Sequence, residues 1–221
     1  MSTQTISTLS WKRILISLAI FILIPFAAHL IDLKINQYAI SLMFCMNIGT
    51  SILIIYDWNL FGIHYNRAKH NTMDTILYTA IGAILIMLWI YVGSNFLQAN
   101  IILPGNSDLI EYGYARPGMM IAFSFMEAAC VSISFKCFTD HLNVRGKEFQ
   151  SILLSGLLFG LLFTVIYLPV WDVGLFFRTY LYNMVLTAYL AYLYNQCHTF
   201  IPGMLAMSII YFIVMFQSTM M

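Results

Sequence analysis

The sequence has little charge. Asp, Glu, Lys and Arg make up 9% of its 221 residues, and the formal net charge is +1. Soluble domains carry about 25% charged residues, so this chain is not expected to fold as a soluble globule. Its basic residues are dispersed and form no run, which argues against nucleic acid as a partner. Its four cysteines form no Cys-x-x-Cys pair, so a zinc or redox motif of that kind is not expected.

Hydrophobic residues, by contrast, make up 61% of the chain, and the mean hydropathy is +0.84. A membrane-spanning helix needs about 20 apolar residues, within a range of about 17–25. Seven runs approach or reach that length: Ile14–Ile31, Tyr38–Tyr56, Thr75–Leu97, Gly118–Phe138, Ser151–Trp171, Gly174–Tyr194 and Ile201–Phe216. The sequence therefore predicts an all-α, polytopic membrane helical bundle of about seven transmembrane helices in a single domain, residues 1–221. Whether the short last run fully spans stays open.

Basic residues in the short connections predict the orientation, because Lys and Arg concentrate in cytoplasmic loops. In a seven-span arrangement most of them fall on one side: Lys12, Arg13, Arg67, Lys69, Arg145 and Lys147. The N-terminus is therefore expected in the cytoplasm and the C-terminus outside. The segment Asp57–Asp74 is expected to be a cytoplasmic linker in which His64 and His70 are solvated.

The fourth run carries a carboxyl group, Glu127, near its middle. A charge at the centre of a membrane helix costs about 2.5–3.5 kcal/mol on insertion scales. Ser124 lies three residues earlier on the same helical face, and Lys136 lies near the end of the run. Glu127 is therefore a functional candidate, or else a neutral group that links helices by hydrogen bonds; both interpretations stay open.

The sixth run adds further polar candidates, Arg178, Tyr182 and Asn183. Asp172 precedes the run and is expected to cap its first turn, and an ion pair between Asp172 and Arg178 is plausible. Tyr182 or Asn183 is a possible hydrogen-bond partner for Glu127 across the bundle.

The fifth and sixth runs are joined by only Asp172 and Val173, which predicts two antiparallel neighbouring helices. Gly156 and Gly160 lie four residues apart in the fifth run. Small residues at this spacing allow two membrane helices to approach closely. Close helix packing is therefore the expected role of these glycines.

The order of these parts resembles the CAAX-protease and bacteriocin-processing family (CPBP, also called ABI) of intramembrane metalloproteases. Its members have a span bearing Glu-Glu-x-x-x-Arg, a basic turn, a span ending in Phe-Gly-Leu-x-His, and a later helix bearing His-x-x-x-Asn or Asp. The resemblance covers Asp57 to the C-terminus and is most specific at Ser151–Phe163 and Ala191–Tyr211. It implies a CPBP-like region in residues 57–221, which follows the two N-terminal spans predicted in residues 1–56, and a bacterial cell membrane as the location.

The family's histidines are replaced in this chain. The Phe-Gly-Leu phrase is present from Phe159, but its histidine position holds Phe163. The later histidine falls on Met207, and its Asn or Asp partner falls on Tyr211.

The glutamate pair is lost as well. One register places Glu127 and Ala128 at the pair and Ser132 at the arginine. The other, which fits the spacing to Phe159 somewhat better, places Val131 and Ser132 at the pair and Lys136 at the arginine. The register stays open.

A hydrolytic zinc site needs about three protein ligands and an open position for water. Phe163 and Met207 offer no suitable donor, so no catalytic residue, metal or cofactor is expected. The resemblance then implies a non-catalytic pseudo-protease that binds a membrane protein or peptide, as in bacteriocin immunity or scaffolding. The alternatives are a CPBP-type metallo-endopeptidase with divergent motifs, which would hold zinc, and a small-solute-binding transport subunit.

Overall fold

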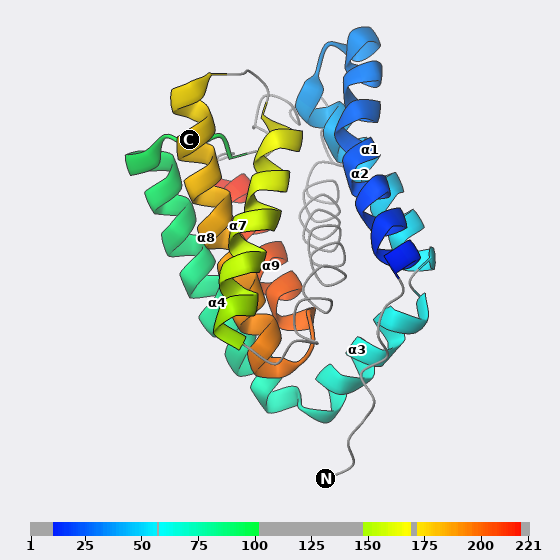
Figure 1. Ribbon diagram of the computed structural model, residues 1–221, viewed down its shortest axis with the longest axis vertical. Helices are drawn as coiled ribbons and strands as arrows, with labels where there is room; N and C mark the ends of the chain where they lie inside the picture. The colour runs from blue at the N-terminus through cyan, green and yellow to red at the C-terminus, as the bar shows by residue number, and fades with distance from the viewer. Residues whose placement is uncertain (1–10, 57, 102–147, 169–171, 218–221) are drawn as a thin grey trace.

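The computed structural model describes residues 11–56, 58–101, 148–168 and 172–217, and all regular structure in these residues is helical. This confirms the all-α prediction. The elements, labelled as in Figure 1, are α1 (Trp11–Ile35), α2 (Tyr38–Tyr56), α3 (Trp58–His70), α4 (Thr72–Val92), the π-helix η1 (Gly93–Leu97), α7 (Glu148–Tyr167), α8 (Val173–Cys197) and α9 (Ile201–Gln217).

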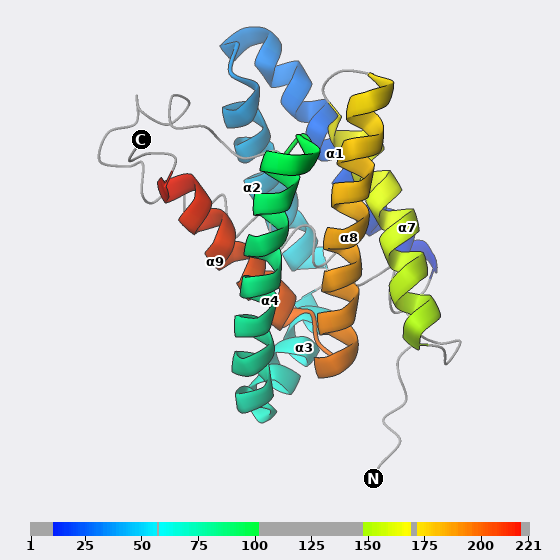
Figure 2. The ribbon, with the colours of Figure 1, turned by 90° about the vertical axis from the view of Figure 1, so that its left-hand side faces the viewer.

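The helices form two hairpins, α1–α2 and α7–α8, and α3, α4 and α9 pack between and beside them. α1 packs on α2, and α7 packs on α8, each pair running in opposite directions (Figure 1). α4 contacts both α8 and α9, and Figure 2 shows α4 and α8 side by side with α9 crossing obliquely. α3 joins the lower end of α2 to the lower end of α4. The predicted antiparallel contact between the fifth and sixth runs is therefore confirmed.

The predicted runs correspond well to helices. α2 has the predicted bounds, Tyr38–Tyr56, and the other five described runs match helices whose ends shift by up to four residues. The predicted span Gly118–Phe138 lies outside the described residues. Apolar patterning located these helices because a lipid-facing helix needs a nearly continuous hydrophobic surface.

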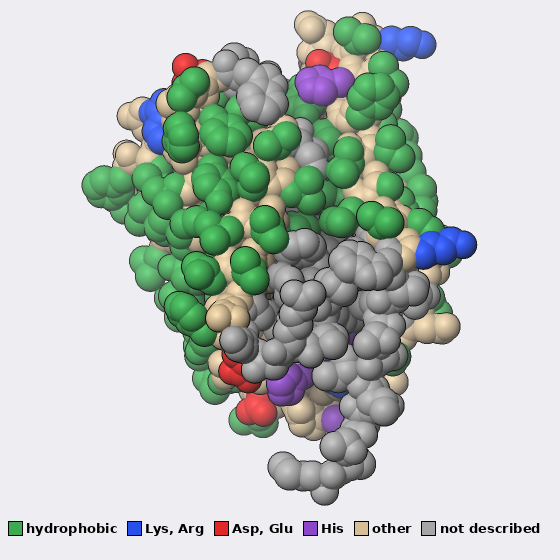
Figure 3. All heavy atoms as spheres, in the orientation of Figure 1, with side chains coloured by type: hydrophobic (Ala, Val, Ile, Leu, Met, Phe, Trp, Pro, Cys, Tyr) green, Lys and Arg blue, Asp and Glu red, His purple; other side chains and the backbone are tan. Residues whose placement is uncertain are grey.

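Several of the described helices suit a membrane. Three segments are long and apolar enough to cross, namely Leu18–Ile35, Thr72–Leu97 and Glu148–Val165, and a fourth is obtained if α2 and α3 count as one bent span. α9 is apolar but short, and α8 is long but carries more polar residues. Hydrophobic side chains cover most of the described surface between the two ends of the face in Figure 3, and acidic side chains lie at those ends. The chain is therefore a helical, membrane-type protein.

The linker predicted between the second and third runs is largely a helix, α3, and His64 is not solvated. Only 2% of His64 is exposed, and its ring lies 5.0 Å from that of Phe200 and 6.1 Å from that of Tyr194. The polar composition misled the prediction, because side chains spaced three and four residues apart still give α3 one face that packs inward: Phe61, His64 and Ala68. His70 is exposed, as predicted.

Candidate functional site

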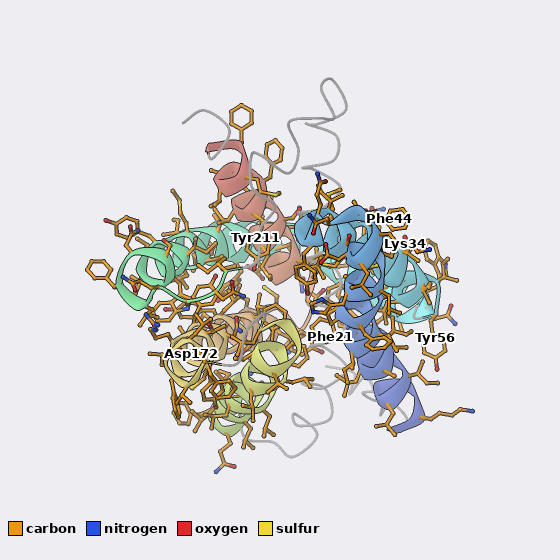
Figure 4. All side chains as sticks on the ribbon, turned by 90° about the horizontal axis from the view of Figure 1, so that it is seen from above. Phe21, Lys34, Phe44, Tyr56, Asp172 and Tyr211 are labelled. Atoms are coloured by element: carbon orange, nitrogen blue, oxygen red, sulfur yellow. The ribbon has the colours of Figure 1, made fainter. Side chains whose placement is uncertain are left out.

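The residues that the CPBP resemblance aligns with the later metal-site motifs lie in the packed interior. Phe163 on α7 is 8% exposed, and Met207 and Tyr211 on α9 are 0% and 3% exposed. The Phe163 ring stacks with Phe21 of α1 at 5.9 Å, and Phe159, one turn earlier, stacks with the same ring at 5.7 Å. Figure 4 shows Phe21 and Tyr211 on the inner sides of their helices. Aromatic and thioether side chains therefore occupy these positions as part of one apolar core.

These side chains do not suit zinc. Zinc in proteins is bound by Cys, His, Asp or Glu, whereas Phe163 has no donor atom and methionine sulfur suits Cu(I). Among the residues that the structure describes, no three His, Cys, Asp or Glu side chains are placed to hold a metal ion. The donor set at Phe163, Met207 and Tyr211 therefore does not fit the metal that the family resemblance implies.

A row of buried polar side chains lies along α8. Thr179, Asn183 and Thr187 follow at four-residue intervals, so they share one side of the helix, and all are at most 3% exposed. Asn183 Nδ2 donates to Thr164 Oγ1 of α7 at 2.9 Å, and Thr187 Oγ1 lies 3.2 Å from the Gly156 carbonyl oxygen. We call these three residues the α8 polar row. Asn183 and Thr187 of this row connect α8 to α7 by hydrogen bonds, and Thr179 accepts from the Asn100 backbone N–H.

Two glycines of α7 make this close contact possible. A Cβ atom on Gly160 would lie 2.7 Å from Met184 Cα and 2.8 Å from Met184 N of α8. A Cβ atom on Gly156 would lie 3.0 Å from the Met184 carbonyl oxygen. The role predicted for the Gly156–Gly160 pair, close approach of two helices, is therefore confirmed.

Tyr182 is held by α4 on another side of α8. The indole Nε1 of Trp89 donates to the Tyr182 carbonyl oxygen at 2.9 Å, and the two rings are nearly parallel, 7° apart with centroids 6.2 Å apart. A Cβ atom on Gly93, where η1 begins, would overlap the Tyr182 ring at Cδ2. π-Helical turns are often found at functional sites. Here η1 leaves room for the Tyr182 ring, which is 2% exposed.

Arg178 and Asp172 do not form the ion pair that was considered plausible. Asp172 Oδ1 accepts from the Leu175 backbone N–H at 2.7 Å, which confirms its predicted role as the cap of α8. Arg178 instead donates through Nε to the Gly174 carbonyl oxygen and through Nη1 to Gln98 Oε1, both at 3.1 Å. Capping orients the Asp172 carboxylate toward the backbone, and the arginine reaches across to the end of η1.

The sequence candidates thus separate into two groups. Tyr182 and Asn183 lie inside the bundle, whereas Arg178 is exposed at its end. The remaining candidates and degenerate family positions lie outside the described residues: Ser124, Glu127, Val131, Ser132 and Lys136. The contact proposed between Glu127 and Tyr182 or Asn183 stays a prediction.

Sequence reasoning missed several interior polar contacts. Thr164, Thr179 and Thr187 were not recognised, although the four-residue spacing of the two threonines around Asn183 was a readable signal. The sequence assigns Trp89 no role either. No local signal identified its bond to Tyr182, because that bond depends on how α4 and α8 pack.

The C-terminal end of α8 contacts α3. Arg67 Nη1 donates to the His198 carbonyl oxygen at 3.1 Å, where a cation interacts favourably with the helix C-terminus. Cys197, the last residue of α8, is a buried free thiol. Burial, with a smaller contribution from the charge of Asp74, raises the pKa of Cys197 to about 11. The Cys197 thiol is therefore protonated and unreactive at neutral pH.

Comparison of the chain with protein-family models, with curated proteins and with solved structures finds no match.

Proposed function

We propose that the chain is a non-catalytic integral membrane protein of CPBP type that binds a membrane-embedded protein or peptide. The observation that carries this proposal is the packing of Phe163 against Phe21 at 5.9 Å. A catalytic zinc site keeps one position open for water. An aromatic stack at the family's histidine position supports a closed core, in which Met207 and Tyr211 are also buried.

The outer surface of α7 is the best candidate for the binding face. Leu154, Leu158 and Val165 are 41%, 49% and 42% exposed, and they lie on the helix that carries the Phe-Gly-Leu phrase. The α8 polar row forms hydrogen bonds with α7 and with the backbone near η1, so its side chains are engaged inside the bundle and do not form a binding surface for a partner. Because lipid offers no hydrophobic driving force, a partner helix here would bind through side-chain packing.

Site-specific photo-crosslinking in native membranes tests this proposal. A photoreactive residue at Leu158 of α7 is expected to give a discrete protein- or peptide-sized adduct. The matched control is Ile84 of α4, which is 61% exposed and also apolar, and it is expected to give lipid adducts only. Lipid adducts alone at both positions would refute the proposed binding face.

Two alternatives are separated by simple measurements. Stoichiometric zinc that survives dialysis, together with peptide cleavage that a chelator abolishes, would establish the divergent endopeptidase. A ligand-dependent rise in melting temperature, or co-purification with an ATPase, would favour the solute-binding transport subunit.

We further propose seven spans, with the N-terminus in the cytoplasm and the C-terminus outside. Figure 1 shows the start of α1 and the whole of α3 below the end of α1 and the start of α8. Lys12, Arg67 and Lys69 belong to the lower segments, and Lys34 and Arg178 belong to the upper ones. The larger basic count marks the cytoplasmic side. Reporter fusions at the two termini test this, and reporters active on one and the same side would exclude an odd number of spans.

A further inference from the structure

The helix α3 turns sharply away from the helix before it. The segments Ile40–Tyr56 and Phe61–His70 make an angle of 83°. α3 has only 13 residues, which is too few to cross a bilayer that needs about 20. If α2 crosses the membrane, α3 therefore runs close to the plane of the bilayer surface.

One side of α3 is fixed to the bundle. His64 packs on Phe200, and the Thr199 hydroxyl lies 3.2 Å from the His64 carbonyl oxygen. Arg67 donates to the C-terminus of α8. These contacts determine which side of α3 faces outward, so its outer side chains are held in a fixed place.

A row of aromatic and basic residues lies on an outer flank of α3. Trp58, Tyr65 and Lys69 are spaced seven and four residues apart, which places them on one side of the helix. Trp58 is 66% exposed and Tyr65 is 57% exposed, and Lys69 is exposed as well. Within the described parts of the chain, the Lys69 ammonium group makes no hydrogen bond or ion pair. This flank is therefore open to an external partner.

We propose that the Trp58–Tyr65–Lys69 row is a binding site for the headgroups of anionic phospholipids. Trp and Tyr side chains favour the headgroup level of a bilayer, and Lys near the surface is attracted to anionic lipids. Arg67 and His70 place further cationic or protonatable groups in the last turn of α3, with one acidic residue, Asp74, in the turn that follows. This inference requires a membrane-embedded bundle and does not depend on the proposed partner of α7.

Quenching of Trp58 fluorescence by brominated lipid tests the site directly. The full chain is reconstituted in two kinds of phosphatidylcholine vesicle. One contains brominated phosphatidylglycerol, and the other contains the same fraction of brominated phosphatidylcholine. The difference between the wild-type protein and Trp58→Phe isolates the Trp58 signal. We expect the phosphatidylglycerol to quench Trp58 preferentially, and Lys69→Gln to weaken that preference about fivefold, since one basic residue contributes about that factor.

The matched control is Lys34→Gln, since Lys34 is an exposed lysine in the last turn of α1, and Figure 1 shows that turn at the end of the bundle away from α3. It is expected to leave the preference unchanged. Equal quenching by the two brominated lipids would overturn the anionic site. If aqueous iodide quenches Trp58 and neither brominated lipid does, α3 does not lie at the headgroup level. That result would overturn the proposal and would point to a soluble partner. Unchanged melting temperatures for both lysine variants verify that the fold is intact.

Discussion

Replacing Gly160 with alanine tests whether the α7–α8 contact is as close as the structure indicates. The new Cβ atom would lie 2.7 Å from Met184 Cα, although carbon atoms pack at about 3.5–4.0 Å. The helices must then separate locally by about 0.8 Å, taking the lower packing limit of about 3.5 Å. Because the opposing atoms belong to the α8 backbone, no side-chain rotation relieves the contact.

The expected cost follows from three contributions. Overpacking costs about 1–3 kcal/mol, and alanine returns about 1 kcal/mol of helix propensity. Separation also weakens the bonds from Asn183 to Thr164 and from Thr187 to Gly156, at about 0.6 kcal/mol each. Gly160→Ala is therefore expected to destabilise the protein by about 1–3 kcal/mol, the sum of these ranges.

Equilibrium unfolding in detergent micelles measures this cost. Gly62→Ala in α3 is the matched control, since no atom outside its own stretch of helix lies within 4 Å of its Cβ position and the substitution should stabilise by up to about 1 kcal/mol. Gly156→Ala, with its nearest contact at 3.0 Å, should fall between the two. Equal stability of Gly160→Ala and Gly62→Ala would show that α7 and α8 are not in backbone contact.

Three further predictions address the core, its polar row and its thiol. Phe21→Ala is expected to lower the free energy of unfolding by about 3–5 kcal/mol, because the ring is fully buried against α7. Phe44 lies on the outer side of α2 (Figure 4), so Phe44→Ala should cost far less. Similar losses for the two variants in thermal unfolding would contradict this. A double-mutant cycle with Asn183→Ala and Thr164→Val should give a coupling free energy of about 0.6 kcal/mol, and strict additivity would mean that their hydrogen bond is absent. With Cys197 as the one remaining cysteine, labelling by a thiolate-specific reagent should accelerate as pH rises toward about 11, and a plateau below pH 9 would contradict the raised pKa. The pKa of the Cys197 thiol is higher in the folded protein than in the unfolded chain, where it is about 8.5. The protonated thiol therefore contributes its full share to the free energy of unfolding below about pH 8.5, and that share falls as the pH rises through the folded pKa.

The apolar patterning was enough to predict much of the fold. Runs of apolar residues located the described helices other than α3, and α2 has the predicted bounds. The Asp172–Val173 connection correctly predicted that α7 and α8 are antiparallel neighbours. These features are local, because each depends on residues within one helix or one turn.

The parts that sequence reasoning missed depend on contacts between distant segments. His64 was read as solvated because its neighbours are polar, yet the ends of α8 and α9 bury it. Arg178 was paired with the nearest carboxylate, Asp172, but Gln98 lies across from it in space. Neither outcome can be read from spacing along one helix, since both depend on how separate helices pack.

The interior contacts also bear on where function is located. Buried polar groups in a membrane bundle either bind something or specify how the helices pack. Asn183 and Thr187 bond to α7, and Thr179 accepts from the Asn100 backbone N–H at 3.0 Å. Each of these residues therefore has a protein partner that fixes the position of α8. The polar row of the described interior therefore serves helix packing, the second of these two roles.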